Sequence, residues 1–363
     1  MTGNRRMLVL RAVVEDYIRS HEPIGSTALA RRHDLGVSSA TIRNDMAALE
    51  DEGYLTQPHT SAGRIPTEKG YRYFVDRLST VMPMSPAQRS GIAAFLSGSV
   101  SLQDTLRRAA RILSSITGQV AVVASPSLSK ATLRHVELVP VASMALLAVV
   151  ITDTGRVAQH TIGVRRMPAP DALAALGEAV NARCGGRPLT AAADLVRTLA
   201  RDPRWQGHAA LCESLADAFD GMADDEMAGE LYVAGASRLA YQGSPDDLAP
   251  LFDALEEQVV IMRLMSELSA EHGAAGAGVA IGSETHTPGL MHASVVAGGY
   301  GNASETGDGT TDAGDGATAS PVAFVGSIGP THMDYAATIA AVRAVARYLT
   351  ATVAAGGADT AEG

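Results

Sequence analysis

The 363-residue sequence predicts an α+β protein built from more than one domain. At roughly 150 residues per domain, this length corresponds to two or three domains. The first 78 residues show three helical patterns and then a polar hairpin, whereas later segments alternate between β-branched runs and Ala- and Leu-rich helical patterns. Hydrophobic residues make up 46% of the chain and charged residues 19%, a globular composition that excludes a wholly disordered chain.

Three helices are expected near the N-terminus, over residues 5–20, 26–33 and 40–52. Apolar residues recur at helical spacing in the first of these, and Pro23 ends it. The third ends at Gly53, in the position where a glycine commonly terminates a helix. Three short helices in this order are typical of a helix-turn-helix domain that binds DNA.

The third helix has one apolar face and one polar face. Ile42, Met46 and Leu49 follow one another at i, i+4 and i+7, so we expect this face to point into the core. The opposite face and the first turn carry hydroxyl, amide and guanidinium groups, which a recognition helix uses in the major groove. These candidate DNA-binding residues are Ser38, Ser39, Thr41, Arg43 and Asn44. The alternative is that the serines only cap the helix and that Arg43 and Asn44 pair with nearby acids.

A polar hairpin follows the third helix directly. A short strand is expected at 54–56, and the loop over 57–67 carries a glycine with an arginine beside it. Such a wing contacts backbone phosphates or the minor groove, although an ordinary surface hairpin has the same composition. A helix over 68–78 closes this winged-helix head, for which we expect the bounds 1–80. Further candidate DNA contacts are His59, Thr60, Ser61 and Arg64 in the hairpin, and Arg31 and Arg32 in the second helix.

The net charge of −10 is unevenly distributed along the chain. Residues 1–78 hold 11 Lys/Arg and 10 Asp/Glu, a net charge of +1, whereas residues 79–363 hold 18 and 29, a net charge of −11. An acidic protein is repelled by DNA, so a neutral to basic first segment indicates a nucleic-acid-binding head on an acidic body.

Beyond a Pro-rich linker at 81–87, helices and strands are both expected. The expected helices are 88–96, 101–117, a long amphipathic helix at 251–271, and 335–353; the expected strands are 119–124, 133–141, 145–152, 157–163, 231–234, 279–281, 293–297 and 322–328. Residues 168–275 are mainly helical in pattern. The segment 301–320 consists of small, polar and acidic residues, and we expect it to be a disordered acidic loop.

Two blocks of the first segment resemble the HrcA family of heat-inducible transcription repressors. Residues 37–46 read VSSATIRNDM, and residues 57–71 read QPHTSAGRIPTEKGY. Landmarks near the C-terminus, at 281–284, 294–296 and 329–335, are also similar to this family, so the resemblance spans most of the chain. At two positions the sequence differs from the family pattern: His332 stands where we expect arginine, and Thr285 where we expect asparagine.

The resemblance implies three domains: a winged-helix head, a GAF-like α/β domain, and a mainly helical dimerisation domain inserted within it. On this basis we expect the GAF-like domain over 88–167 and 276–355, the insertion over 168–275, and a tail over 356–363. The family likeness also implies a homodimer that binds an inverted-repeat operator upstream of chaperone genes. It further implies that the GroEL chaperonin supports the active repressor, and that heat stress, by occupying the chaperonin, releases repression.

The sequence also allows two other classes of function, an enzyme or metal protein and a transcription factor that responds to a small molecule. His286, His292 and His332, together with Glu284 and Asp334, could be metal ligands or acid–base groups, but they have no ligand-motif spacing. The segment 326–330 could cradle a phosphate, but it lacks the lysine of a P-loop. We therefore predict no enzyme activity, no metal and no cofactor. The alternative that stays open is a winged-helix transcription factor that responds to a small molecule.

The sequence also bears on the compartment. The N-terminus lacks the pattern of a signal peptide, and the longest apolar run, 139–151, is shorter than the roughly 18 residues of a membrane span. Cys184 and Cys212 are too few for a disulfide scaffold and match no metal spacing, so we expect two buried thiols in a reducing compartment. These observations predict a soluble cytoplasmic protein with no membrane partner.

Overall fold

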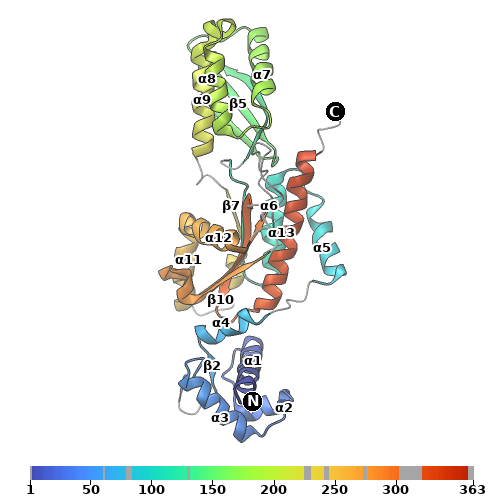
Figure 1. The fold of residues 1–363 in the computed structure, drawn as a ribbon, viewed down its shortest axis with the longest axis vertical. Coiled ribbons are helices and arrows are strands. Elements are labelled where there is room, and N and C mark those ends of the chain that lie inside the picture. The colour runs from blue at the N-terminus through green and yellow to red at the C-terminus, as the bar shows by residue number, and fades with distance from the viewer. Residues whose placement is uncertain are drawn as a thin grey trace, which may run out of the picture.

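Three parts follow one another along the long axis of the molecule (Figure 1). A helical head with a short hairpin lies at one end, a five-stranded sheet between helices lies in the middle, and a lobe with a three-stranded sheet lies at the other end. This computed structural model describes residues 2–59, 62–78, 84–128, 131–224, 230–240, 245–272, 276–301 and 321–358. The predictions for residues 302–320 of the acidic loop and for Thr60 and Ser61 fall outside these ranges.

The head contains the helices and the hairpin that the sequence predicts. Its elements are α1 (Thr2–Ser20), α2 (Ser26–Arg32), α3 (Ser39–Asp51), β1 (Leu55–Thr56), β2 (Ile65–Pro66) and α4 (Glu68–Asp76). Gly53 adopts the left-handed φ of 76° that ends α3, and Thr67 caps α4 by accepting from the amide of Gly70. Ile42, Met46 and Leu49 are fully or almost fully buried, as their spacing predicts.

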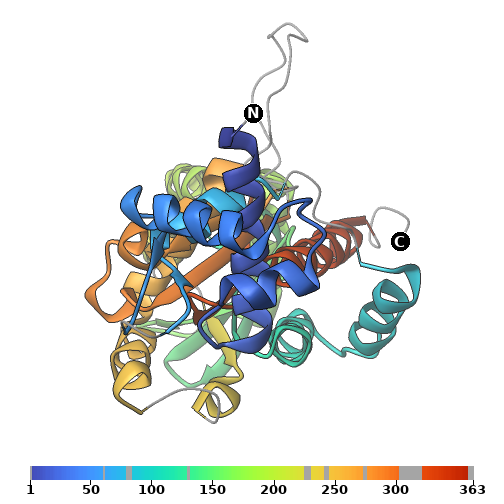
Figure 2. The same ribbon diagram turned by 90° about the horizontal axis from the view of Figure 1, so that it is seen from below.

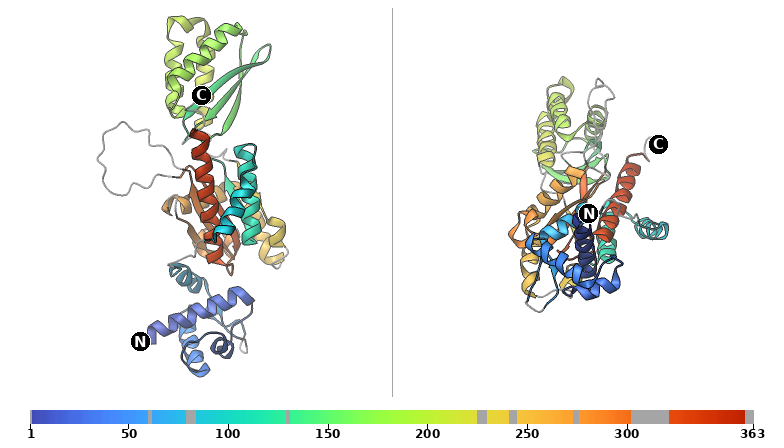
Figure 3. Two further views of the ribbon diagram at one scale, coloured as in Figure 1. Left: turned by 90° about the vertical axis from the view of Figure 1, so that its right-hand side faces the viewer. Right: turned by 60° about the horizontal axis from the view of Figure 1, so that its bottom comes forward.

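The middle part is an antiparallel sheet with the strand order β7-β3-β10-β9-β8. Its strands are β3 (Val120–Ala124), β7 (Leu231–Ala234), β8 (Gly278–Ile281), β9 (Ala293–Tyr300) and β10 (Ala323–Pro330). Helices α6 (Leu102–Thr117) and α13 (Tyr335–Ala358) pack on one face, and α11 (Pro245–Glu256) and α12 (Gln258–His272) pack on the other. Helix α5 (Pro86–Leu96) lies outside α6, on the same side as α13 (Figure 3).

The lobe pairs a second sheet with three helices. Its elements are β4 (Leu133–Ala142), β5 (Ala145–Thr152), β6 (Val157–Gly163), α7 (Pro170–Cys184), α8 (Leu189–Ala200), the 3-10 turn η1 (Pro203–His208) and α9 (Ala209–Asp224). Every second residue of β5 is buried, and these side chains share one core with the three helices. The alternate residues of β5, on the other face of the sheet, are only partly buried.

The lobe changes the expected division of the chain. The sequence predicts that the strands over 133–163 belong to the same domain as residues 119–124, but these strands form a separate sheet. Conversely, β7 and α12 fall within the expected insertion of 168–275, yet β7 pairs with β3 and α12 packs on the middle sheet. The cause is long-range strand pairing, because β3 finds its partners more than one hundred residues away in sequence.

Two helix predictions also need correction. The single helix expected at 251–271 is two helices, α11 and α12, separated at Glu257 without any proline or glycine to mark the break. Val259, just after this break, is 53% exposed. Helix α5 begins at Pro86, inside the expected linker, because Ser85 and Gln88 form a capping box there.

Candidate nucleic-acid interface

Helix α3 is held with one face against the rest of the head. Asp45 lies on the buried face, and its carboxylate accepts two hydrogen bonds from the Arg5 guanidinium, at 2.8 Å (Nε) and 3.0 Å (Nη2). These bonds raise the pKa of Arg5. The bidentate contact ties α3 to α1 and fixes which face of α3 points outward.

The outward face of α3 carries Arg43 and Asn44. Both residues are exposed, and within the described parts of the chain neither side chain makes a hydrogen bond or an ion pair. Among the described residues, therefore, they do not pair with nearby acids. Ala40 precedes them by one turn and Ala47 follows them by one turn, so small side chains flank the two polar groups. An α-helix of this shape can approach a groove floor closely while two polar groups reach out.

The hydroxyl groups at the start of α3 form a cap. The Ser38 Oγ atom accepts from the Thr41 amide at 3.3 Å and lies 3.0 Å from the Thr41 hydroxyl. The capping interpretation therefore applies to Ser38, whereas Ser39 is the first residue of the helix. A hydroxyl group has two acceptor lone pairs, so this cap leaves Ser38 able to make one more contact.

The hairpin is fixed to the loop between α1 and α2. Ile24 and Arg64 exchange two backbone hydrogen bonds of 2.9 Å each, which adds a third segment beside β1 and β2. A Cβ atom at Gly63 would lie 2.5 Å from the carbonyl carbon of Ile24, so only glycine permits this approach. The Gln57 side chain donates to the carbonyl of Ala62 at 2.8 Å and closes the loop.

The four candidate arginines of the head fall into two groups. Arg64 donates from Nε to Glu50 at 2.9 Å, and Arg32 lies 3.4 Å from the fully buried carboxylate of Asp16. Arg31 and Arg43 are exposed, and no ion pair involves them in the part of the chain that the structure describes. Arg31 and Arg43 are therefore the two candidates whose charge is not already matched within the head.

The remaining candidates of the hairpin are only partly placed. His59 is exposed, and Thr60 and Ser61 fall outside the described residues. Sequence reasoning missed Asp16, Asp45 and Glu50, which orient the candidate contacts. The signal for Asp45 was present, because a carboxylate on the apolar side of an amphipathic helix requires a cationic partner.

The residues considered for a metal or phosphate site have other roles. Glu284 forms an ion pair with Arg72, and the His332 ring packs edge-on against His21 with 4.5 Å between centroids. Across the described ranges, no group of three or more His, Cys, Asp or Glu residues is placed to hold a metal ion. The segment 326–330 is part of strand β10, and a Cβ atom at Gly326 would lie 2.5 Å from the Val296 carbonyl oxygen. Gly326 therefore serves close strand packing, and the segment is a strand and not a loop that cradles phosphate.

No helix in the described portion of the chain is both long enough and apolar enough to cross a membrane.

Comparison with known proteins gives two consistent results. The family model for the HrcA protein C terminal domain matches residues 103–339. The sequence is 66% identical to the heat-inducible transcription repressor HrcA of Bifidobacterium adolescentis over 98% of both chains. It is 47% identical to the protein of the same name from Kineococcus radiotolerans, over 98% of this chain and 100% of that one.

A solved structure supports the fold. A crystal structure of a hypothetical protein at 2.2 Å resolution aligns with a TM-score of 0.61 and 23% sequence identity, covering 97% of this chain and 98% of that one. The similarity extends over the head, the middle sheet and the lobe together, because so much of both chains is covered.

Proposed function

The chain belongs to the HrcA family of heat-inducible transcription repressors, and we propose that its head is a winged helix that binds operator DNA. The exposed and unpaired Arg43 and Asn44 on α3 carry this proposal. Arginine can bond guanine through two hydrogen bonds, and asparagine can bond adenine in the same way. In this role α3 is the recognition helix, and the hairpin that Ile24 and Gly63 fix to the head is the wing.

The wing and α2 would supply contacts to the DNA backbone. Arg31, which has no acidic partner among the described residues, is suited to a phosphate contact. Arg64 and Arg32 are already paired, so we infer a smaller or shared role for them. His59, Thr60, Ser61, Ser39 and Thr41 remain candidate contacts of the same surface.

Repression requires two heads on one operator. We infer a homodimer whose two-fold axis matches an inverted repeat, because two related heads then read two related half-sites. The lobe supports this inference through the outer face of its sheet. Leu147, Val149 and Ile151 alternate with the buried residues of β5 and point to that face, and the exposed side chains of Val139 and Val157 flank them.

Regulation by heat follows from the family. We infer that the operator lies upstream of chaperone genes and that the GroEL chaperonin supports the active repressor. The middle sheet, in this proposal, is a GAF-like domain that connects the heads to the dimerisation lobe. Occlusion of the promoter by the bound dimer is sufficient for repression.

The test measures binding to a duplex that carries the inverted repeat upstream of the chaperone operon, against a scrambled duplex, at one fixed salt concentration. Arg43→Ala and Asn44→Ala should each weaken binding to the repeat by about fivefold to a hundredfold, because each removes a base contact of about 1–3 kcal/mol. Arg347→Ala, on α13 of the body, removes the same charge far from α3 and should leave the affinity unchanged.

Adding GroEL should increase the fraction of protein that binds the repeat. Equal affinity for the repeat and the scrambled duplex under every condition would contradict the operator proposal. That outcome would instead favour a factor that needs a small molecule before it binds DNA.

A further inference from the structure

We propose that Arg72 and Glu284 form a positioning joint that holds the head in one orientation on the body, so that the dimer accepts only one spacing between half-sites. The inference rests on the proposed DNA-binding function. It gives a role to the two C-terminal landmarks, residues 281–284 and 329–335, which neither the recognition helix nor the lobe explains.

The ionic part of the joint connects α4 to the 3-10 turn η2 (Gly282–Thr285). The Arg72 guanidinium donates to both carboxylate oxygens of Glu284, through Nε at 2.8 Å and through Nη2, and Nη2 also donates to the Val279 carbonyl at 2.7 Å. The side chains are 29% and 38% exposed, so water screens this contact only in part. A bidentate pair fixes direction as well as distance, which a single contact does not.

A second polar contact lies one helical turn away on α4. Glu68 accepts from the Ser283 hydroxyl at 2.6 Å and from the Ser283 amide at 3.3 Å. Gly282 has a φ of 52°, and a Cβ atom there would lie 2.0 Å from the Glu68 carboxylate. Glycine at 282 therefore lets Glu68 reach the turn. Helix α4 thus presents one cation and one anion to η2. The Ile281 backbone amide donates to the Glu284 carboxylate at 3.0 Å and holds this acceptor in place.

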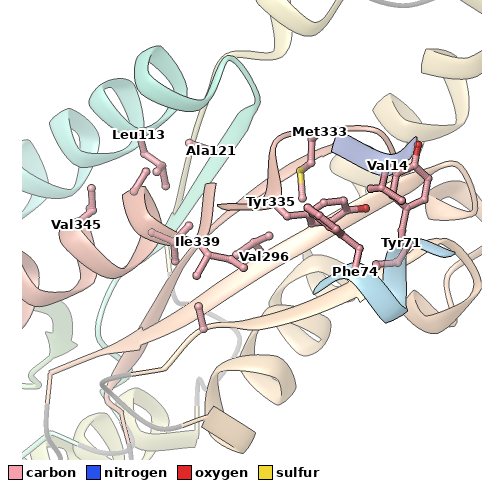
Figure 4. Packing of buried hydrophobic residues seen from close by; sticks show 14 of the residues in the cluster. Val14, Tyr71, Phe74, Leu113, Ala121, Val296, Met333, Tyr335, Ile339 and Val345 are labelled. Carbon is pink, nitrogen blue, oxygen red and sulfur yellow. The ribbon is translucent and has the colours of Figure 1, made fainter. Parts of the chain in front are cut away.

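Apolar packing extends the joint toward the sheet. Tyr71 and Phe74 of α4 share a core with Met333 and Tyr335 of the body, and the rings of Tyr71 and Tyr335 lie 6.0 Å apart (Figure 4). All four side chains are buried. The Tyr335 hydroxyl donates to the Thr331 carbonyl at 2.6 Å, which fixes the ring that faces the head.

A third contact involves a different helix of the head. His21 follows the end of α1, and its ring packs edge-on against His332, 4.5 Å away, while Tyr17 of α1 lies 6.3 Å from the same ring. The head is therefore held at α4 and at the end of α1. Two separate points of attachment oppose rotation of the head about either one of them.

The joint does not cover the proposed DNA-reading surface. Helix α4 is the part of the head nearest the middle sheet in Figure 1, whereas α3 lies at the far end of the head, and in Figure 2 the head faces the viewer in front of the body. Arg43 and Asn44 stay exposed while the joint is formed. The contacts therefore aim α3 and do not block it.

A fixed orientation has a direct consequence for a dimer. Once one head is bound, the second binds at an effective concentration that depends on how well its position matches the second half-site. A head that turns freely must be ordered on binding, which costs affinity, and it can also reach half-sites at other spacings. Losing the joint should therefore weaken binding to the correct operator and relax the requirement for its spacing.

The experiment compares the full-length dimer with Arg72→Ala, Arg72→Lys and Glu284→Gln on three kinds of duplex: a single half-site, the inverted repeat with its natural spacer, and repeats with the spacer changed by about 2 and 5 base pairs. The control is Glu15→Gln, which removes one charge of a pair within α1 that touches no part of the joint. Dimer mass and melting temperature are measured for each variant.

Wild type and Glu15→Gln should bind the natural spacer much more tightly than the altered ones. The joint variants should bind the single half-site as wild type does, lose about tenfold on the natural repeat, and show a flatter dependence on spacer length. Arg72→Lys keeps the charge but loses the bidentate contact, so it should share this behaviour even if Arg72→Ala unfolds.

An unchanged spacer dependence in folded, dimeric joint variants would overturn the inference and leave the proposed function standing. Failure of the wild-type protein to bind either the half-site or the repeat would instead contradict the proposed function itself.

Discussion

Arg64 shows how a residue that is predicted to contact DNA can first be required by the protein itself. Its guanidinium pairs with Glu50 of α3 and is only 17% exposed. Arg64→Ala and Glu50→Gln should each lower the free energy of unfolding by about 1 kcal/mol, because the first removes the charged hydrogen bond and the second leaves only a neutral acceptor for Arg64. Urea unfolding of the two variants checks this equality.

The same two variants separate the structural role of Arg64 from a role in binding. If Arg64 also contacts a phosphate, Arg64→Ala should reduce the slope of log affinity against log salt concentration by about 1, and Glu50→Gln should leave it unchanged. Equal salt slopes in wild type and both variants would restrict Arg64 to holding the hairpin on α3.

The two cysteines should be unreactive in the folded protein. Both are buried in the core of the lobe, and burial raises the pKa of each thiol from 9.0 to about 11. The neutral thiols therefore stabilise the fold fully below pH 9, and this contribution is lost as the pH rises toward 11. A thiol-labelling reagent at pH 8 should modify neither residue until denaturant unfolds the lobe. Rapid labelling of the native protein would contradict this burial.

At the scale of secondary-structure elements, the contact between α1 and α3 sets the orientation of α3, the proposed recognition helix. Asp45→Ala should lower the melting temperature of the head by about 5 °C, because Arg5 loses its partner and a buried site loses its hydrogen bonds. Asp51→Ala is the matched control, since Asp51 is an exposed acid of the same helix and forms no ion pair with any residue that the structure describes. Similar melting temperatures for the two variants would show that the Asp45 contact does not stabilise the head.

Elements with local signals were predicted well from the sequence. Ser38 marks the start of α3, Gly53 marks its end, and Thr67 marks the start of α4. Such caps act over a few residues, so they can be recognised within a short stretch of sequence. The break between α11 and α12 could not be predicted, because no proline or glycine marks it. Each of the two helices packs on the middle sheet or its flanking turn, so tertiary contacts determine where the helix is interrupted.

At the scale of the whole molecule, the arrangement of the parts depends on contacts that sequence patterns do not reveal. Arg72 and Glu284 are 212 positions apart, and the motif containing Glu284 resembles the family without indicating its partner. For a similar reason, the sequence did not reveal that the strands over 133–163 form a sheet separate from the middle sheet. Its strands have the right alternation, but alternation does not identify the strands with which they pair. For the candidate interface, exposure of Arg43 and Asn44 was predictable, whereas the pairing of Arg32 and Arg64 was not.

The outer face of the lobe sheet leads to a prediction about assembly. Val149→Lys places a charge in the middle of the apolar stripe on β5, opposite Glu137 of β4, so burying this face against a second copy would require two charged side chains to lose their water. The variant should be monomeric at concentrations where wild type is dimeric, as measured by sedimentation equilibrium. Its affinity for the inverted repeat should then fall to that for a single half-site, because the second head is no longer tethered. Ala175→Lys adds the same side chain to an exposed position of α7 and should remain dimeric. A dimeric Val149→Lys protein would place the contact between copies elsewhere on the molecule.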